Sequence, residues 1–149
     1  MTENLLHSEG AGAFLIFTNG LLGLQLKDNL PYLNGPWALS TFGGGIEEGE
    51  NQLEALAREL DEELEMKLLD HEYEYLCDVE YPVNEKGVKG VSHKYIVKNV
   101  DLNSLKVKEG SICVIDPYTN LDYLIFSPYV KPAVEKAIGR IREILEDSK

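Results

Sequence analysis

Three glutamates at helical spacing are the most distinctive chemical feature of the sequence. Glu59, Glu62 and Glu63 stand at positions i, i+3 and i+4, so a helix would bring them together on one face. Carboxylates this close repel one another, and partial burial would raise the pKa of at least one of them. A hard divalent cation relieves that repulsion, and Mg²⁺ is commonly held by one or two carboxylates together with substrate phosphates. The trio therefore predicts a metal site, against the simpler interpretation of a solvated acidic face.

The residues around the trio favour the metal interpretation. Residues 47–65 carry nine carboxylates against one arginine, a local charge of −8. A separate apolar face would anchor the helix in a core: Leu53, Leu56, Leu60 and Leu64. Glycines lie directly upstream, and they allow a backbone to turn a carbonyl toward a metal or to pass close to a phosphate: Gly43, Gly44, Gly45 and Gly49. Glycine loop, helix and trio together point to chemistry more strongly than any one of them.

With its spacing, the segment resembles the Nudix box. Gly44 is followed by five residues and Glu50, then by seven residues and the run Arg58-Glu59-Leu60-Asp61-Glu62-Glu63-Leu64-Glu65-Met66. Every specified position of the box matches except that of Glu65, where the family has Gly. The order of the flanking strands and helices is also similar to the Nudix α/β/α sandwich.

The resemblance implies hydrolysis of a nucleoside diphosphate linked to another group X, with Mg²⁺ or Mn²⁺ as cofactor. By position, Glu59 and Glu63 would be metal ligands, and Glu62 a further ligand or the group that orients the attacking water. A backbone carbonyl at Gly43 or Gly44 would add a ligand. Such chemistry needs no cysteine or serine nucleophile, because a metal lowers the pKa of bound water.

Three further positions follow from the same resemblance. Arg58 would pair with Glu50 and hold the loop against the helix. Glu109, just before the apolar run 111–116, would be an additional metal ligand or base, although it is equally interpreted as a loop residue beside a turn. Replacement of the usual Gly by Glu65 removes the left-handed cap that Gly supplies. We therefore expect the helix to run further or to end less sharply.

The substrate is less well defined by the sequence. Trp37, Tyr32 and Phe42 are candidates to stack on a base, although Trp37 is equally interpreted as a core residue. Tyr81 is a weaker candidate for substrate contact and is better interpreted as a core residue. The chain resembles short, MutT-like Nudix proteins, which favours a nucleoside triphosphate or related nucleotide as substrate. Pro82, 16 residues after the box, is at a spacing seen in ADP-ribose hydrolases of the family and supports a nucleoside diphosphate sugar as the alternative.

The elements that must position these residues alternate between strands and helices. Residues 12–28 predict a hairpin around Asn19 and Gly20, and a short strand follows at 37–42. Strict alternation predicts a half-buried strand at 72–81, with Tyr73, Tyr75, Cys77, Val79 and Tyr81 on one face. Further strands are expected at 91–100 and 111–116, and helices from about 51 to 64 and from about 127 to 146. This pattern predicts an α/β fold whose mixed central sheet has helices on both faces.

Composition excludes several other classes of protein. A length of 149 residues fits one domain spanning 1–149, and a net charge of −12 argues against a nucleic-acid polymer or an anionic membrane as partner. No apolar run approaches the roughly 18 residues of a membrane span. Cys77 and Cys113 are expected to be reduced core residues, so we expect a cytoplasmic protein. The resemblance to Nudix proteins implies a small nucleotide as the partner, and a monomer or homodimer is expected. A nucleotide-sensing domain without catalysis and a purely structural acidic domain remain as alternatives.

Overall fold

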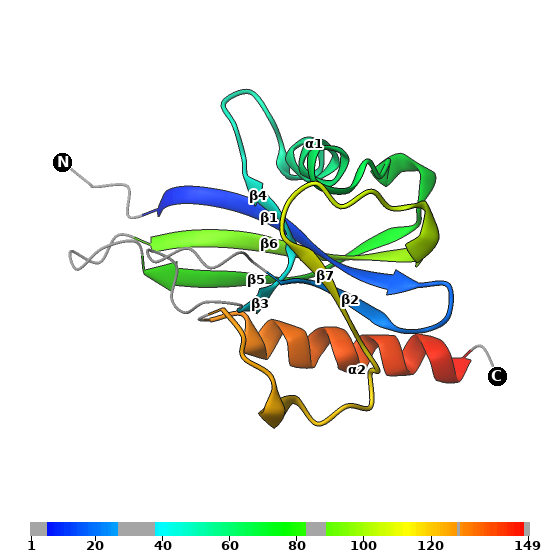
Figure 1. Cartoon of the computed structure of the whole chain (residues 1–149). Helices are drawn as coiled ribbons and strands as arrows, with labels where there is room; N and C mark the ends of the chain where they lie inside the picture. The colour runs from blue at the N-terminus through cyan, green and yellow to red at the C-terminus, as the bar shows by residue number, and fades with distance from the viewer. Residues whose placement is uncertain (1–5, 27–37, 83–88, 128, 148–149) are drawn as a thin grey trace.

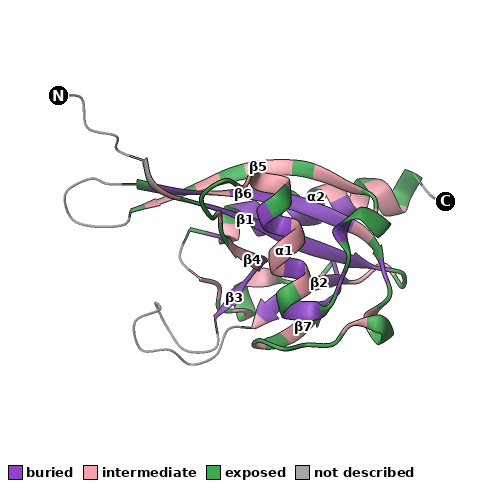
Figure 2. Cartoon of the chain, turned by 90° about the horizontal axis from the view of Figure 1, so that it is seen from above, coloured by how far each residue is buried: buried purple, intermediate pink, exposed green. Residues whose placement is uncertain are grey.

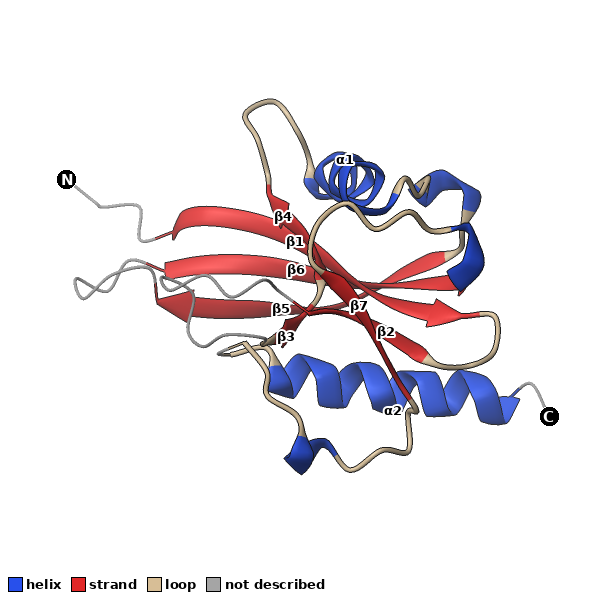
Figure 3. Ribbon diagram, viewed as in Figure 1, coloured by secondary structure: helices blue, strands red, loops and turns tan. Residues whose placement is uncertain are grey.

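The computed structural model describes residues 6–26, 38–82, 89–127 and 129–147, which form a mixed sheet between two helices (Figures 1 and 3). The helices are α1 (Gln52–Leu64) and α2 (Lys131–Asp147). The strands are β1 (Leu6–Phe17), β2 (Leu22–Leu26), β3 (Leu39–Ser40), β4 (Phe42–Gly45), β5 (Tyr73–Pro82), β6 (Lys89–Val100) and β7 (Ser111–Ile115). Short 3₁₀ turns occur at Leu68–Asp70, Leu102–Ser104 and Leu121–Tyr123.

The strand order β3-β2-β1-β6-β5 places β1 and β6 side by side at the centre of the sheet. These two strands run parallel, whereas β1 pairs antiparallel with β2 and β4, and β2 pairs antiparallel with β3 and β7. α1 covers one face of the sheet and α2 the other (Figure 1). The predicted mixed sheet with helices on both faces is confirmed.

Each face of the sheet builds its own core, because successive residues of a strand point to opposite sides. On β1, Ala13 and Leu15 pack with the buried leucines of α1, while Phe14 and Ile16 pack with the apolar stripe of α2. The buried residues follow the middle of the sheet and the inner sides of both helices (Figure 2). The site residues of α1 are therefore fixed by a packed core beneath them.

The strict alternation predicted for β5 is wrong. The pairing of β5 with β6 shifts register between Tyr75 and Cys77, as a β-bulge does. Tyr73 packs against the α1 core, but Cys77 and Val79 pack against the α2 core on the opposite face. One extra residue in the strand reverses the side to which every later side chain points.

Both ends of α1 are specified locally. At its start, the side chain of Asn51 accepts a hydrogen bond from the backbone N–H of Glu54, and the Glu54 carboxylate accepts from the N–H of Asn51. At its end, Glu65 itself takes the left-handed conformation, with φ 52° and ψ 40°, and its N–H caps the Asp61 carbonyl. The expectation that the helix would run on or end less sharply is wrong, because Glu65 adopts the conformation that Gly usually supplies.

The carboxylate of Glu65 is balanced by lysines of the loop before β7. Its oxygens lie 2.9 Å from Lys108 Nζ and 3.4 Å from Lys106 Nζ. The Lys108 hydrogen bond holds the pKa of Glu65 below its usual value. These cations offset the unfavourable position of a carboxylate at a helix C-terminus.

α2 begins at Lys131, later than the predicted start near residue 127, because Tyr129 has a positive φ of 71° that no α-helix contains. Its apolar stripe is buried against the sheet: Ala133, Val134, Ala137, Ile138 and Ile141. No helix within the described ranges is long and apolar enough to cross a membrane.

Candidate active site

Glu59 lies directly against the glycine strand β4. Its side chain is only 16% exposed, and a Cβ on Gly44 would meet its Oε1 at 2.5 Å. The absence of a side chain at Gly44 therefore makes the space that the carboxylate occupies. Burial raises the pKa of Glu59, a hydrogen bond from Arg58 opposes that rise, and repulsion from Glu62 and Glu109 adds to it. The raised pKa agrees with the expectation that partial burial raises the pKa of at least one of the closely spaced carboxylates.

Glu63 is the buried member of the trio and ties α1 to the sheet. It is 2% exposed, and its two carboxylate oxygens accept hydrogen bonds from the backbone N–H of Gly43 at 3.1 and 3.3 Å. Gln25 of β2 donates to the same carboxylate at 3.4 Å. Gly43 has a φ of 143°, and a Cβ there would overlap the Ala11 carbonyl at 2.0 Å. Glycine is therefore required for the approach of β4 to both β1 and Glu63.

Arg58 forms hydrogen bonds with several carboxylates of the segment. It donates to the two oxygens of Glu50 at 2.7 and 3.0 Å, and to the Gly45 carbonyl at 3.0 Å. The same guanidinium reaches Glu59 Oε1 at 3.0 Å and Glu62 Oε2 at 3.4 Å. The hydrogen bond between Arg58 and Glu50 lowers the pKa of Glu50 and raises the pKa of Arg58. The predicted contact of Arg58 with Glu50 is present and links the loop to the helix.

The loop before β7 brings Glu109 toward the same end of α1. The N–H of Lys108 donates to the Glu63 carbonyl at 2.8 Å, and the carbonyl of Glu109 accepts from Gln25 Nε2 at 3.3 Å. Gly110 follows with a φ of +68°, where the chain turns into β7. Glu109 is close enough to Glu59 for its charge to raise the pKa of that residue. Two segments about 50 residues apart in sequence thus meet at one acidic site.

The carboxylates fit a hard cation by chemistry, although they are not gathered around one point. Among the described residues, no three His, Cys, Asp or Glu side chains form a ready metal-binding group. Arg58 draws Glu59 and Glu62 toward itself, and the backbone of Gly43 holds Glu63. The donors are all oxygens, which is the set that Mg²⁺ and Mn²⁺ accept. The residues present therefore suit the ion that the sequence predicts.

The Gly44 carbonyl is directed toward β1, since a Cβ on Gly10 would meet this oxygen at 3.0 Å. Its assignment as a metal ligand stays a prediction. What the structure shows for Gly44 is the space it leaves for Glu59.

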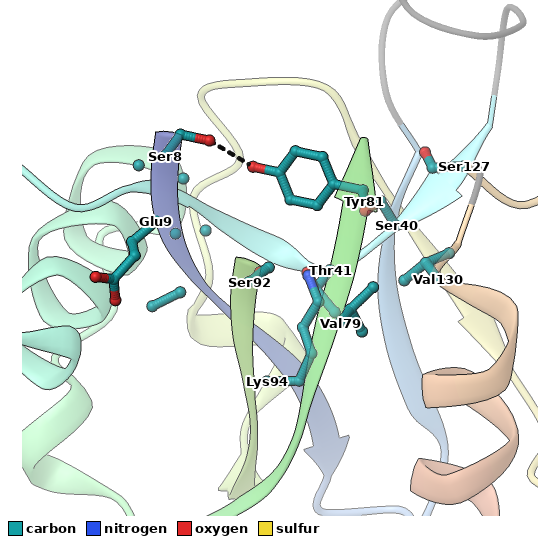
Figure 4. A pocket seen from close by; sticks show the side chains of 15 residues that line it. Ser8, Glu9, Ser40, Thr41, Val79, Tyr81, Ser92, Lys94, Ser127 and Val130 are labelled. Carbon is teal, nitrogen blue, oxygen red and sulfur yellow. Dashed lines mark hydrogen bonds between the residues drawn. The ribbon is translucent and has the colours of Figure 1, made fainter. Parts of the chain in front are cut away.

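A pocket of about 430 Å³ adjoins the glycine strand (Figure 4). Residues 43–45 form one border, and Val130, which directly precedes α2, lies on another side. Tyr81 lines the pocket, and its hydroxyl is 3.1 Å from Ser8 Oγ. Lys94 also lines it and is hydrogen bonded to Thr41 Oγ1 at 2.7 Å.

The predicted stacking residues have different outcomes. Phe42 is fully buried in the α1 core, so its assignment to substrate stacking is wrong. Tyr32 and Trp37 lie outside the described residues. Tyr81 is partly buried and lines the pocket, as a substrate contact must. Sequence reasoning missed Lys94 and Gln25; the signal for Lys94 was a lysine in the middle of an apolar strand, an uncommon place for that residue.

Solved structures with the same fold include several nucleotide-processing proteins. The MutT protein of Methanosarcina mazei superposes with a TM-score of 0.72 at 15% identity, covering 99% of this chain and 100% of that one. The dihydroneopterin triphosphate pyrophosphohydrolase of Escherichia coli gives 0.70 at 13% identity over 91% and 99%. The Nudix domain of Shewanella oneidensis NrtR, solved with ADP ribose, gives 0.68 at 16% identity over 94% and 90%. None of the curated protein sequences matches this chain.

These likenesses define the α/β sandwich of MutT-like proteins as the fold. The family model of the NUDIX domain matches residues 7–112, which include all of β1 except its first residue, the glycine strand and the whole of α1. The chain belongs to the Nudix family and is accordingly a hydrolase acting on phosphoric anhydride bonds.

Proposed function

We propose that the protein is a magnesium-dependent pyrophosphohydrolase that cleaves a nucleoside diphosphate linked to a group X, with a nucleoside triphosphate or related nucleotide as the favoured substrate. The observation that carries this proposal is the acidic site between α1 and β4. There Glu59 packs on Gly44 with a raised pKa, and Glu63 is anchored on the Gly43 N–H. These contacts hold oxygen donors beside a pocket of nucleoside size.

Glu59, Glu62 and Glu63 would hold Mg²⁺ or Mn²⁺ at this site. A bound cation would neutralise diphosphate charge and lower the pKa of a coordinated water. Arg58 keeps Glu59 and Glu62 within reach of each other and fixes the loop through Glu50. Glu59, Glu62 and Glu109 remain the candidates for the general base, because all three carboxylates belong to the same electrostatically coupled group.

The pocket beside the glycine strand would take the part of the substrate that is not phosphate. Its volume of about 430 Å³ suits a nucleoside-sized ligand. Tyr81 offers an aromatic ring at the wall, where a base or sugar can pack on it. The hydroxyls of Ser8 and Tyr81 are held together and give the same wall a polar edge.

A hydrolysis panel with product identification tests the proposal. Nucleoside triphosphates and nucleoside diphosphate sugars are incubated with Mg²⁺ or Mn²⁺, and the products are separated by chromatography. We expect pyrophosphate and a nucleoside monophosphate from at least one triphosphate, with loss of activity in Glu59→Gln. Glu48→Gln is the matched control, because Glu48 is an exposed carboxylate in the loop between β4 and α1 and stands outside the specified box positions. Equal activity of Glu59→Gln and Glu48→Gln contradicts the proposal.

The second candidate substrate is a nucleoside diphosphate sugar. It is supported by the Nudix domain of NrtR, which was solved with ADP ribose, and by Pro82, which ends β5 one residue after Tyr81 of the pocket wall. Release of a sugar phosphate with a nucleoside monophosphate distinguishes this activity from the first. A nucleotide sensor without catalysis is the third candidate, and it is disfavoured by the presence of Glu59, Glu62 and Glu63. It is adopted if no compound in the panel is hydrolysed.

We further propose that the chain acts as one Nudix domain over residues 1–149, as a monomer or homodimer in the cytoplasm. The support is one sheet that contains every described strand, together with two cysteines that are both free.

A further inference from the structure

Lys94 is a buried cation in the wall of the pocket. It is 7% exposed and lies on the central strand β6. Thr41 Oγ1 accepts a hydrogen bond from its Nζ at 2.7 Å. Gly12 on the neighbouring strand β1 makes the space for this pair, since a Cβ there would stand 3.0 Å from Nζ and 2.3 Å from the Thr41 hydroxyl. Three separate segments of the chain therefore cooperate to hold one ammonium group beside the pocket.

The described lining of the pocket carries one charge of each sign. Of the described residues that line the pocket, Lys94 is the one cation and Glu9 the one anion. The Glu9 carboxylate is hydrogen bonded to His93 at 2.8 Å, and Figure 4 shows it turned away from Lys94. Other lining groups with polar side chains are hydroxyls, including Ser8, Ser40 and Ser92. A ligand in this pocket meets a positive donor.

Lys94 and the acidic site lie on opposite faces of the sheet. Phe42 belongs to the α1 core and Gly44 faces Glu59 of α1, so alternation places Thr41 on the other face. On β6, Tyr95 belongs to the α1 core, and Lys94 beside it points the other way. The phosphates of a substrate are expected at the acidic site, so Lys94 is placed for the non-phosphate part.

We propose that Lys94 selects nucleotides whose base presents an oxygen acceptor in place of an amino group: 6-oxopurines over 6-aminopurines, and 4-oxopyrimidines over 4-aminopyrimidines. This inference rests on the proposed function, because it assigns the base of the substrate to this pocket. An ammonium group donates and never accepts, so it can form a hydrogen bond to a ring carbonyl and cannot form one to the hydrogens of an exocyclic amino group. The same logic lets lysine recognise the O6 and N7 acceptors of guanine. The pocket would therefore discriminate by chemistry at one position of the base.

Equilibrium binding of matched nucleoside monophosphates tests the proposal without relying on hydrolysis. IMP and AMP differ at position 6, and UMP and CMP differ at position 4. In each pair the exchange of an oxo for an amino group also turns the adjacent ring N–H into an acceptor, so both members are compared at the same edge of the base. We expect calorimetry to show IMP and UMP bound about 10- to 100-fold more tightly than AMP and CMP. Lys94→Met should weaken the oxo member of each pair and abolish the preference. Lys98→Met is the matched control, because Lys98 lies on the same strand but does not line the pocket.

Each outcome bears on the proposal. Equal binding of both members of each pair to the wild type overturns it, and this comparison requires no variant. Equal weakening of all four nucleotides by Lys94→Met also overturns it, because the lysine would then act on the phosphate.

If Lys94→Met does not fold, Lys94→Gln is used; its amide also accepts hydrogen bonds, so the preference for oxo bases should shrink. A preference retained by Lys94→Gln counts against the proposal. Base-selective binding without hydrolysis of any panel compound refutes the proposed enzyme activity and leaves the role of Lys94 standing.

Discussion

Substitution of Gly44 by Ala should disable the acidic site while leaving the fold intact. The added Cβ would stand 2.5 Å from Glu59 Oε1 and 2.7 Å from Glu59 Cδ, whereas ordinary contact begins at 3.4 Å. The carboxylate must therefore move by about 0.9 Å, and a misplacement of about 1 Å costs on the order of 100-fold in rate. We expect kcat/KM to fall about 100-fold, which corresponds to about 2.7 kcal/mol in the activation barrier.

The chain offers a closely matched control for this experiment. A Cβ on Gly45 would have the Glu9 carbonyl as its nearest neighbour at 3.9 Å, and neither Gly44 nor Gly45 has a positive φ. Alanine thus fits the backbone at both positions, and stability should change by less than about 1 kcal/mol in either variant. Steady-state kinetics on the best substrate of the panel and thermal unfolding would be measured for both. A Gly44→Ala enzyme within threefold of Gly45→Ala would refute the placement of Glu59 against Gly44 as the basis of activity.

Three further substitutions test other parts of the structure. Arg58→Lys loses the two-point contact with Glu50 and should lower kcat/KM about tenfold; unchanged kinetics would show that the contact is dispensable. Glu65→Gly relieves a left-handed non-glycine residue and should raise the melting temperature by about 2–4 °C, whereas a lower melting temperature would mean that the lysine contacts matter more. Burial lowers the pKa of His93, but hydrogen bonds to Glu9 and Asp78 outweigh it and raise the pKa above 6.5. The charged form therefore stabilises the fold below pH 6.5, and this contribution is lost as the pH rises through the raised folded-state pKa. Urea unfolding should show that loss in the wild type and not in His93→Gln; parallel pH profiles would contradict it.

The acidic site was largely predictable because its information is local. Helical spacing brings Glu59, Glu62 and Glu63 to one end of one helix, and the spacing of Glu50 from Arg58 specifies their contact. Helical spacing alone does not say how far each of the three carboxylates is buried. Glu63 is buried by β2 and β4, Glu62 is 59% exposed on its side chain, and only the packed structure separates them.

The errors of sequence reasoning arise where distant segments decide the outcome. Alternation assigned one face to all the odd residues of β5, but a bulge after Tyr75 reverses the later ones. Phe42 is an aromatic residue beside the glycines, yet it points into the α1 core. It lies two residues before Gly44 on the same strand, so both residues face α1. The position of Lys94 Nζ depends on its hydrogen bond to Thr41 and on the space left by Gly12. The pairing of strands brings these residues together, and no local sequence pattern encodes that pairing.

The affinity of the protein for Mn²⁺ reports directly on the proposed metal site. Titration followed by electron paramagnetic resonance would compare the wild type, Glu59→Gln and Glu48→Gln, each checked for folding by circular dichroism. We expect Glu59→Gln to weaken Mn²⁺ binding by about tenfold or more, while Glu48→Gln binds as the wild type does. Equal Mn²⁺ affinity in all three proteins would contradict the claim that the glutamates of α1 form a metal site.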